Sequence, residues 1–306
     1  MAEATTVPSA TTSSDSTTEP LVAVRNLHRV YVRPRTSLRK PAARVEALCG
    51  VSFDVAAGQR FGIVGESGSG KSTLLRLLCA LDTPTSGSVR FGGQEIGGRS
   101  ERELGFLRRE LQIVFQDPMG SLDPRMRVRD IISEPLVAQR HADRAGRLRE
   151  LLDAVGLPPD AGNRFPHQFS GGQRQRISIA RALATHPRVL VADEPVSALD
   201  VSVRAQILNL LADLVEQYSL TLVFVSHDLS VVRHVCDTVA VMHRGRLVEM
   251  GPTDKVYDAP EHPYTRRLVA SIPTIRRALS GVDAAELARE AAEAGEDPTD
   301  TEDDDA

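Results

Sequence analysis

Aromatic residues are scarce in this chain and tryptophan is absent: Phe, Tyr and Trp together make up 4% of its 306 residues. Proteins that bind single-stranded nucleic acid stack the bases on aromatic side chains. The composition therefore gives little support to recognition by base stacking, and we expect no nucleic acid among the partners.

Long apolar runs are also missing. A membrane-spanning helix needs roughly 20 apolar residues in a row, whereas the richest stretches here, Val189–Ala192 and Leu220–Val225, have the length of single strands. We therefore expect any membrane role to be peripheral. The three cysteines, Cys49, Cys79 and Cys236, are far apart, in or beside apolar segments. This favours buried thiols in a reducing cytosol over disulfides or a metal cluster.

The two ends of the chain differ in charge from its body. Residues 1–20 contain no Lys or Arg and no apolar centre, so they do not resemble a secretory signal, and we expect a disordered leader. Residues 282–306 contain eleven acids and one arginine, which predicts an acidic, partly disordered tail. The body between them is net basic, which suits acidic partners such as a nucleotide or simply a solvated surface.

Strand and helix patterns predict an α/β fold. Strand-like runs at the beginning of the chain are Leu21–Asn26, Val45–Val55 and Arg60–Val64. Later, strands at 189–192 and 221–225 flank a helix near 203–218, and such β-α-β alternation predicts a mostly parallel sheet. The charged, helix-forming stretch between these parts looks like an inserted helical lobe.

The segment GESGSGKS follows the strand-like FGIV and precedes a helix, which is the context of a phosphate-binding P-loop. Glycines let backbone N–H groups turn inward around phosphate oxygens. Lys71 would bridge the β- and γ-phosphates of ATP, and Ser72 would ligate Mg²⁺. The residues predicted to bind the cofactor ATP here are Gly65, Glu66, Ser67, Gly68, Ser69, Gly70, Lys71, Ser72 and Thr73.

The segment LVADE is a buried strand that ends in two acids. Open α/β sheets bind ligands at this carboxyl edge. Asp193 is suited to hold Mg²⁺ through water, and Glu194 to polarise the attacking water. Taken alone, such a pair is more often a surface turn or a helix cap, but its position after the motif SGGQ favours the catalytic interpretation.

Together these ordered motifs resemble the nucleotide-binding subunit of an ATP-binding cassette (ABC) transporter over about residues 21–251, and SGGQRQRISIARAL at 170–183 is the most specific of them. The resemblance implies a P-loop NTPase (RecA-like) core with a mostly parallel sheet. It also implies an N-terminal antiparallel β subdomain and an inserted α-helical subdomain at about 117–185. One departure is Phe169, where many cassettes have leucine.

The resemblance also implies roles for single residues. Tyr31 would stack on adenine, and Gln116 would ligate Mg²⁺ and sense the membrane partner. His227 would contact the γ-phosphate, which makes the catalytic set Glu194, His227 and Gln116. Asp200 would cross the interface of a cassette dimer. The signature would contact ATP bound to the opposite subunit through Ser170, Gly171, Gly172 and Gln173.

Three further segments are similar to the oligopeptide, dipeptide and nickel importer branch, and within it to the F-type, or second, ATPase subunit. They are FQDPMGSLDPR at 115–125, FPHQFSGGQRQRI at 165–177 and DEPVSALDVSVRAQILNLL at 193–211, and the tail GPTDKVYDAPEHPYTRRLVASIP at 251–273 agrees with them. The tail predicts a transporter-type C-terminal extension at 252–281. The resemblance implies an ATPase on the cytoplasmic face of the membrane that energises import of oligopeptides or dipeptides.

The partners implied are a second ABC ATPase subunit in a heterodimer, two integral membrane permease subunits and an extracellular solute-binding protein. Three alternatives stay open at this point. The cargo could be nickel or another small solute. The chain could be a soluble ABC ATPase acting on nucleic acid or translation, although such proteins usually carry two cassettes or a long coiled-coil insertion. It could also be a regulatory or assembly cassette without a transport role.

Overall fold

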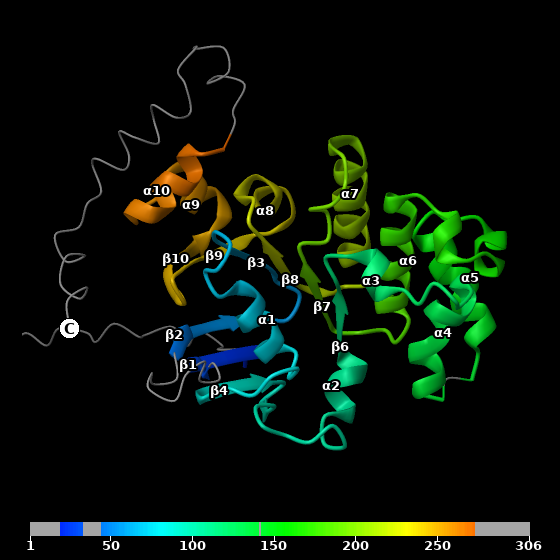
Figure 1. The fold of residues 1–306 in the computed structure, drawn as a ribbon, viewed down its shortest axis with the longest axis horizontal. Helices are drawn as coiled ribbons and strands as arrows, with labels where there is room; N and C mark the ends of the chain where they lie inside the picture. Colours follow the sequence, from blue (N-terminus) through cyan, green and yellow to red (C-terminus); the bar gives the residue numbers. More distant parts are fainter. Residues whose placement is uncertain (1–18, 33–43, 141, 273–306) are drawn as a thin grey trace, which may run out of the picture.

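The computed structural model describes residues 19–32, 44–140 and 142–272, which form two sheets, a helical lobe and a short C-terminal segment (Figure 1). The expected leader at 1–20, except for its last two residues, the end of the expected extension and the acidic tail at 282–306 lie outside the described residues. Among the helices described here, none is both long and apolar enough to cross a membrane.

The smaller sheet is antiparallel, in the order β2-β1-β4-β5. Its strands are β1 (Val22–Val32), β2 (Arg44–Val55), β4 (Ser86–Phe91) and β5 (Gln94–Glu95). This confirms the antiparallel β region expected near the beginning of the chain. Strand β1 runs past Asn26, where the alternating pattern stops, because the pairing with β2 shifts register there and Asn26 adopts a φ of 43°.

The larger sheet has the order β10-β9-β3-β8-β7-β6, and all of its neighbours are parallel except the pair β9 and β10. Its strands are β3 (Arg60–Val64), β6 (Leu111–Val114), β7 (Val189–Asp193), β8 (Thr221–Ser226), β9 (Thr238–His243) and β10 (Arg246–Pro252). The mostly parallel sheet predicted from the sequence is therefore confirmed, and its carboxyl edge is the place where an open α/β sheet binds ligands.

Helices surround this sheet and extend to one side of it. The helices outside the lobe are α1 (Lys71–Leu78), α2 (Gly105–Glu110), α7 (Val201–Gln217), α8 (Leu229–Val235), α9 (Thr253–Asp258) and α10 (Pro263–Ala270). Those of the lobe, green in Figure 1, are α3 (Pro118–Ser121), α4 (Val128–Ala138), α5 (Arg144–Ala154), two 3₁₀ turns (Pro159–Asn163, Pro166–Gln168) and α6 (Gly171–Leu183). The division into domains at the expected boundaries stays a prediction.

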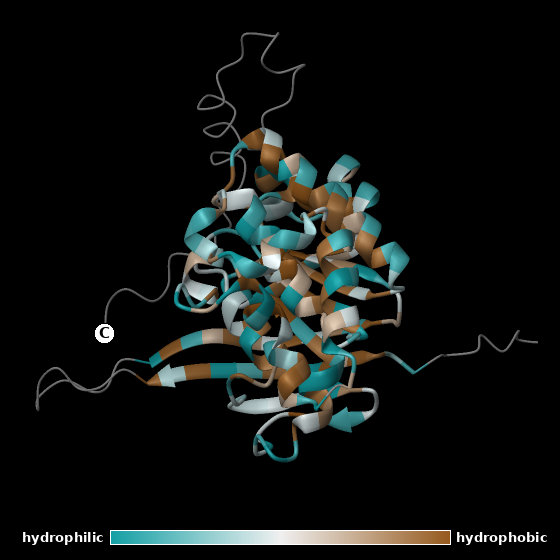
Figure 2. Cartoon of the chain, turned by 90° about the vertical axis from the view of Figure 1, so that its right-hand side faces the viewer, coloured by the Kyte–Doolittle hydropathy of each residue, from teal (hydrophilic) through white to brown (hydrophobic). Residues whose placement is uncertain are grey.

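Two hydrophobic clusters cover opposite faces of the larger sheet. In β7, Val189 and Val191 belong to the cluster shared with β1 and α1, whereas Leu190 and Ala192 belong to the cluster shared with the helical lobe. This alternation explains the continuous apolar run, since both faces of a parallel strand are buried (Figure 2). It also holds β7 in a register that places Asp193 at the carboxyl edge.

Two of the three cysteines, Cys79 and Cys236, are buried as the sequence predicts, whereas Cys49 is only half-buried. All three are free thiols. Burial raises the pKa of the Cys79 and Cys236 thiols well above the usual range, so these groups stay protonated and behave as small apolar side chains.

Candidate active site

The loop between β3 and α1 can accept only glycine at two of its positions. Gly65 has a φ of 156°, and a Cβ there would lie 2.2 Å from the Met242 carbonyl oxygen. Gly70 has a φ of 104°, and its Cβ would lie 2.6 Å from the Ala47 carbonyl oxygen. Both glycines therefore allow the loop to pack against neighbouring backbone while it turns through a conformation that other residues rarely adopt.

Lys71, the first residue of α1, folds back over this loop. Its side chain is buried, and Nζ donates to the carbonyl oxygens of Gly65 at 2.6 Å and Glu66 at 2.8 Å. Burial lowers the pKa of Lys71, and the nearby carboxylates of Glu194 and Asp193 oppose that effect. The ammonium group is thus held at the mouth of the loop, where an anionic ligand could take over its hydrogen bonds.

The N-terminus of α1 is open. Its N-cap, Gly70, provides no side-chain hydrogen bond, and the first turn contains no acid. The first N–H groups of a helix have no intrahelical partner, and with the helix dipole they attract anions. Ser72 and Thr73 lie in this turn and line the adjoining cavity. The arrangement fits a phosphate group.

Glu194 leaves the end of β7 in a strained conformation. Its φ is 43°, in the left-handed region that residues other than glycine seldom occupy, and its N–H donates to the Val225 carbonyl oxygen at 2.9 Å. Its carboxylate Oε2 accepts hydrogen bonds from Gln116 Nε2 at 3.3 Å and His227 Nδ1 at 3.1 Å. Two of the residues predicted as catalytic, Gln116 and His227, therefore meet at one carboxylate oxygen of the third, Glu194. Backbone strain of the kind seen at Glu194 concentrates at functional sites.

The donors available for a metal ion are a hydroxyl, an amide and a carboxylate. Burial, followed by the charge of Glu194, raises the pKa of Asp193, while Lys71 opposes the shift. A cation would therefore relieve the cost of the ionised form. The described residues contain no group of three or more His, Cys, Asp or Glu that could hold a metal. Oxygen donors from Ser72, Gln116 and Asp193 together with substrate phosphates fit Mg²⁺, which uses few carboxylates.

Lys71, Ser72, Gln116, Glu194 and His227 surround a cavity of about 730 Å³, whereas Asp193 lines a neighbouring cavity. The cavity that these five residues surround has a size within the usual range for small-molecule sites. Part of its wall comes from residues 45–47 at the start of β2, and part from Leu268 and Ser271 near the C-terminal end of the described chain. The predicted site residues that line it are Glu66, Ser67, Gly68, Gly70, Lys71, Ser72, Thr73, Gln116, Glu194 and His227.

The signature motif forms the N-terminus of α6 and lies outside the wall of this cavity. Ser170 Oγ accepts a hydrogen bond from Gln173 N at 3.3 Å, and Ser170 N donates to Gln173 Oε1 at 3.0 Å. The pair is a reciprocal capping box. A Cβ on Gly172 would lie 2.4 Å from Val203 Cγ1, so this glycine allows α6 to pack against α7. The chain does not bring its own signature to its own P-loop.

Five other predicted residues are also absent from the cavity wall: Tyr31, Gly65, Ser69, Asp193 and Asp200. Asp200 caps α7, accepting from Val203 N at 3.0 Å. Tyr31 donates its hydroxyl to Asp82 Oδ2 at 2.7 Å, and the Arg29 guanidinium lies 4.5 Å from its ring centre. Its cross-strand neighbour Val45 does line the cavity. The stacking of Tyr31 on adenine stays a prediction.

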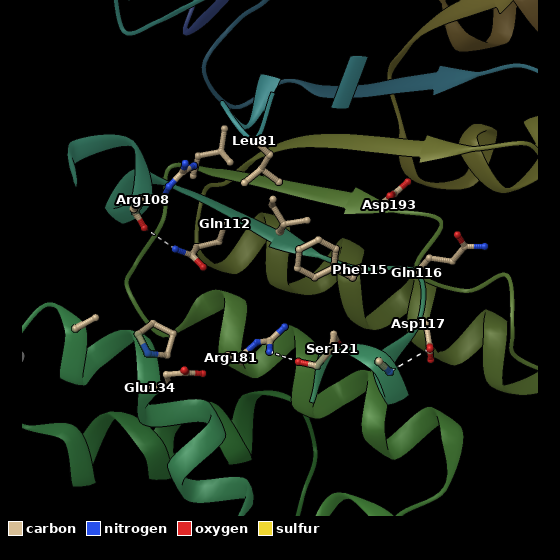
Figure 3. A pocket seen from close by; sticks show the side chains of 15 residues that line it. Leu81, Arg108, Gln112, Phe115, Gln116, Asp117, Ser121, Glu134, Arg181 and Asp193 are labelled. Atoms are coloured by element: carbon tan, nitrogen blue, oxygen red, sulfur yellow. Dashed lines mark hydrogen bonds between the residues drawn. The ribbon is translucent and has the colours of Figure 1, made fainter. Parts of the chain in front are cut away.

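A second cavity, of about 680 Å³, lies between the larger sheet and the helical lobe (Figure 3). Its residues come from α2, β6 and the loop after it on one side, and from α4 and α6 on the other. Phe115 lies at its centre and Gln116 at the end that faces Asp193. Gln116 also lines the nucleotide cavity, so one residue connects the two sites.

Reasoning from the sequence missed the C-terminal contribution to the site. The Glu66 N–H donates to the Tyr264 hydroxyl at 2.9 Å, and Leu268 and Ser271 complete the wall. The motif HPYTRRL at 262–268 lies in this stretch, but its resemblance to a family tail predicts an extension and no contact with the P-loop. Nothing local in that stretch indicates contact with a loop almost 200 residues away.

Three features together define a P-loop nucleotide-binding ATPase. They are a glycine-rich loop before a helix, an acidic pair at the end of a parallel strand two positions away in the sheet, and an inserted helical lobe. Residues 48–197 match the family described as ABC transporter, and residues 248–298 match the oligopeptide/dipeptide transporter C-terminal region. The chain belongs to the ABC transporter family, as one of its ATP-binding proteins.

Curated relatives agree with this assignment. The chain is 50% identical to the di/tripeptide transport ATP-binding protein DppF of Pseudomonas aeruginosa, over 84% of this chain and 80% of that protein. It is 46% identical to the oligopeptide transport ATP-binding protein OppF of Bacillus subtilis, over 84% of this chain and 83% of the relative.

Solved structures share the fold. The ATP-binding cassette MJ0796, a dimer bound to ADP and phosphate after hydrolysis, superposes with a TM-score of 0.66 and 31% identity. That match covers 76% of this chain and 98% of the other. CbiO1 of Clostridium perfringens, part of the transporter complex CbiONQ, superposes with a TM-score of 0.70 and 26% identity, over 86% and 99% of the two chains.

Proposed function

We propose that this chain binds and hydrolyses ATP to energise a membrane importer of oligopeptides or dipeptides. The proposal rests on one observation: Gln116 and His227 both hydrogen-bond to the Glu194 carboxylate, in the cavity that Lys71 also lines. The names of the relatives, which are peptide transport proteins, favour peptide as cargo over nickel. They also favour transport over a role on nucleic acid.

Each residue of the cavity has a task suited to its geometry. When bound, MgATP supplies the γ-phosphoryl group and a metal ion that neutralises its charge. The loop amides and Lys71 would hold the phosphates, while Ser72, Gln116 and, through water, Asp193 would hold Mg²⁺. Glu194 orients the attacking water and accepts a hydrogen bond from it. His227 presents a ring N–H to the same region, so the chain contributes positioning and charge stabilisation.

Hydrolysis requires a second cassette in this proposal. The signature residues lie outside the cavity wall of their own chain, and Ser170 and Gly172 would complete the site of a partner. The dimeric state of the related cassette MJ0796 supports such pairing. For this chain we propose a heterodimer with a second ABC ATPase subunit, in which Asp200 lies at the interface.

The groove between sheet and lobe suits a helix of the membrane subunits. Phe115 is 39% exposed there, and large apolar side chains in a groove are typical anchors for a partner helix. We propose that two permease subunits dock on this face, which places the chain at the cytoplasmic side of the membrane. An extracellular solute-binding protein would complete the complex. Because Gln116 lies in both cavities, docking and nucleotide binding would be coupled through it.

The test of this function is Glu194→Gln in the assembled transporter. The substitution keeps the size of the side chain and removes its negative charge, so ATP should bind within about threefold of wild type, while turnover should fall at least about 100-fold. ATP binding is measured by equilibrium titration and turnover by phosphate release. Hydrolysis by Glu194→Gln at the wild-type rate would remove Glu194 from the mechanism.

Lys71→Ala serves as the contrasting variant. It removes the buried ammonium group that faces the phosphates, so nucleotide binding itself should weaken by at least about tenfold. Nucleotide affinity that stays unchanged in Lys71→Ala counts against the phosphate-binding role of the loop. The two variants thus separate loss of binding from loss of chemistry.

A further inference from the structure

We infer that the C-terminal segment is part of the nucleotide site, and that Tyr264 is a positioning residue that holds the P-loop in its binding conformation. The inference deepens the proposed function, since it rests on nucleotide occupying the cavity beside Lys71. The segment follows the cassette in sequence and contacts the loop through the Tyr264 hydroxyl group.

The contact holds one peptide group from two sides. The Gly65–Glu66 peptide accepts a hydrogen bond from Lys71 Nζ at its carbonyl oxygen, and its N–H donates to Tyr264 Oη at 2.9 Å. An anionic ligand would compete with the Gly65 carbonyl oxygen for the Lys71 ammonium group. Tyr264 accepts from the N–H side of the peptide and is uncharged, so the ligand does not compete for it. The Tyr264 bond can therefore persist when phosphate binds and keep the first turn of the loop in place.

The ring of Tyr264 is fixed by its surroundings. The residue is 3% exposed, and its ring centre lies 4.0 Å from that of His243 at the end of β9. Burial raises the pKa of the Tyr264 hydroxyl, so it remains a neutral acceptor. Because the side chain is already fixed, its hydroxyl loses little conformational entropy when it accepts the hydrogen bond from the Glu66 N–H.

Helix α10 is itself anchored to the edge of the larger sheet. The Glu249 carboxylate in β10 accepts hydrogen bonds from Glu261 N at 2.9 Å and His262 N at 3.0 Å. His262 in turn caps the helix, since its Nδ1 accepts from Tyr264 N at 3.1 Å. Pro263 occupies the first helical position, where it costs no hydrogen bond. The position of Tyr264 is therefore set by the sheet.

The same face of this segment also forms a wall of the cavity. Tyr264, Leu268 and Ser271 are spaced by four and three residues, which places them on one side of a helix. Leu268 is buried and Ser271 is exposed, and both line the nucleotide cavity. The segment thus limits the space for the ligand as well as holding the loop.

Tyr264→Phe tests the inference, because it removes the hydroxyl and keeps the ring. In the full-length chain, the Kd for ADP measured by calorimetric titration should rise about fivefold, the range expected for loss of one hydrogen bond that leaves an N–H unpaired. In the assembled transporter, KM for ATP should rise to a similar extent, while kcat at saturating ATP stays within about twofold. Only a role in holding the binding conformation predicts this division between KM and kcat.

Tyr257→Phe is the matched control. Tyr257 lies in α9 of the same segment, its ring is stacked under the Arg233 guanidinium at 4.0 Å, and it does not line the cavity. Its substitution should leave the Kd for ADP unchanged. An unchanged Kd in Tyr264→Phe, with or without a lower melting temperature, reduces Tyr264 to a structural residue and overturns the inference, while the proposed function stands. Failure of the wild-type chain to bind ADP overturns both.

A second variant does not depend on the buried tyrosine. Ser271→Trp adds bulk at an exposed position of the cavity wall and should weaken ADP binding at least about threefold without loss of folding. Arg266→Trp, an exposed position on α10 away from the cavity wall, is its control and should bind ADP normally. Equal affinity in both tryptophan variants places the segment outside the nucleotide site.

Discussion

Glu194 and Asp193 show at the residue scale that the site is maintained at a cost in stability. Glu194 has a φ of 43°, a conformation that costs on the order of 1 kcal/mol for a residue with a side chain. Asp193 is a carboxylate whose pKa burial raises above its ordinary value of 3.8. In the proposed function both features serve the bound ligands, because a cation would relieve the charge of Asp193 and a nucleotide would use the geometry of Glu194.

Asp193→Asn should therefore stabilise the chain in the absence of nucleotide and Mg²⁺. At pH 7 the ionised carboxylate costs stability, so the variant should gain about 1 kcal/mol in free energy of unfolding. The sign follows from linkage: the pKa in the folded state lies above 3.8, so the cost is present at neutral pH and disappears as the pH falls through the folded pKa. The advantage should shrink between pH 7 and a pH near the ordinary value of 3.8.

Chemical unfolding at the two pH values measures this difference. Asp213→Asn, an exposed position on α7, is the control and should change stability by less than about 0.5 kcal/mol. A nucleotide-free Asp193→Asn protein that is less stable than wild type at pH 7 contradicts the electrostatic account of this site. The variant should also lose ATP turnover, because it removes the carboxylate that would hold Mg²⁺ in the proposed mechanism.

Helix α6 shows at the element scale how a functional motif can also specify local structure. Ser170 and Gln173 satisfy each other's backbone N–H groups at the N-terminus, and Gly172 allows close packing on α7. The signature therefore begins a helix whose N-terminus lies outside the wall of its own chain's cavity. The motif stabilises the helix in this chain and, in the proposed dimer, would contact the nucleotide bound to the partner.

Ser170→Ala should lower the free energy of unfolding by about 1 kcal/mol, the usual effect of losing an N-cap hydroxyl. Ser170→Thr keeps a hydroxyl and should recover most of that loss. Urea unfolding of the isolated chain measures both, without any partner present. If alanine and threonine at this position give the same stability as serine, the capping box contributes nothing to the fold.

The groove between sheet and lobe matters at the scale of the whole molecule. Its lining comes from the larger sheet on one side and the helical lobe on the other, and Gln116 lies at its end beside the nucleotide cavity. A partner bound in the groove would thus contact both regions at once. Movement of the lobe relative to the sheet would then be transmitted to the residues around Glu194.

Phe115→Asn should separate coupling from chemistry. Loss of an aromatic anchor should weaken association with the membrane subunits about tenfold or more, while nucleotide binding by the isolated chain stays as in wild type. Co-purification and transport-coupled ATPase activity measure the first effect, and ADP titration the second. Met250→Asn is the control, because this exposed residue lies on β10, at the sheet edge opposite β6. Normal assembly of Phe115→Asn argues against docking in the groove.

Local sequence patterns are enough to predict several strands and helices of this protein and most of its nucleotide loop. Strands β7 and β8 appear as apolar runs and α1 as a helical period, and a glycine-rich loop can be recognised because its backbone requirement is local. The family resemblance and the carboxyl-edge position of Asp193 follow from the same short-range patterns.

Only the tertiary structure decided which side chains meet. Gln116 and His227 are 78 and 33 residues from Glu194 in sequence, and they reach one oxygen because β6, β7 and β8 are neighbours in the sheet. Tyr264 reaches Glu66 across 198 residues because Glu249 holds α10 against the end of that sheet. Contacts of this kind depend on strand order and packing, for which a local pattern carries no signal.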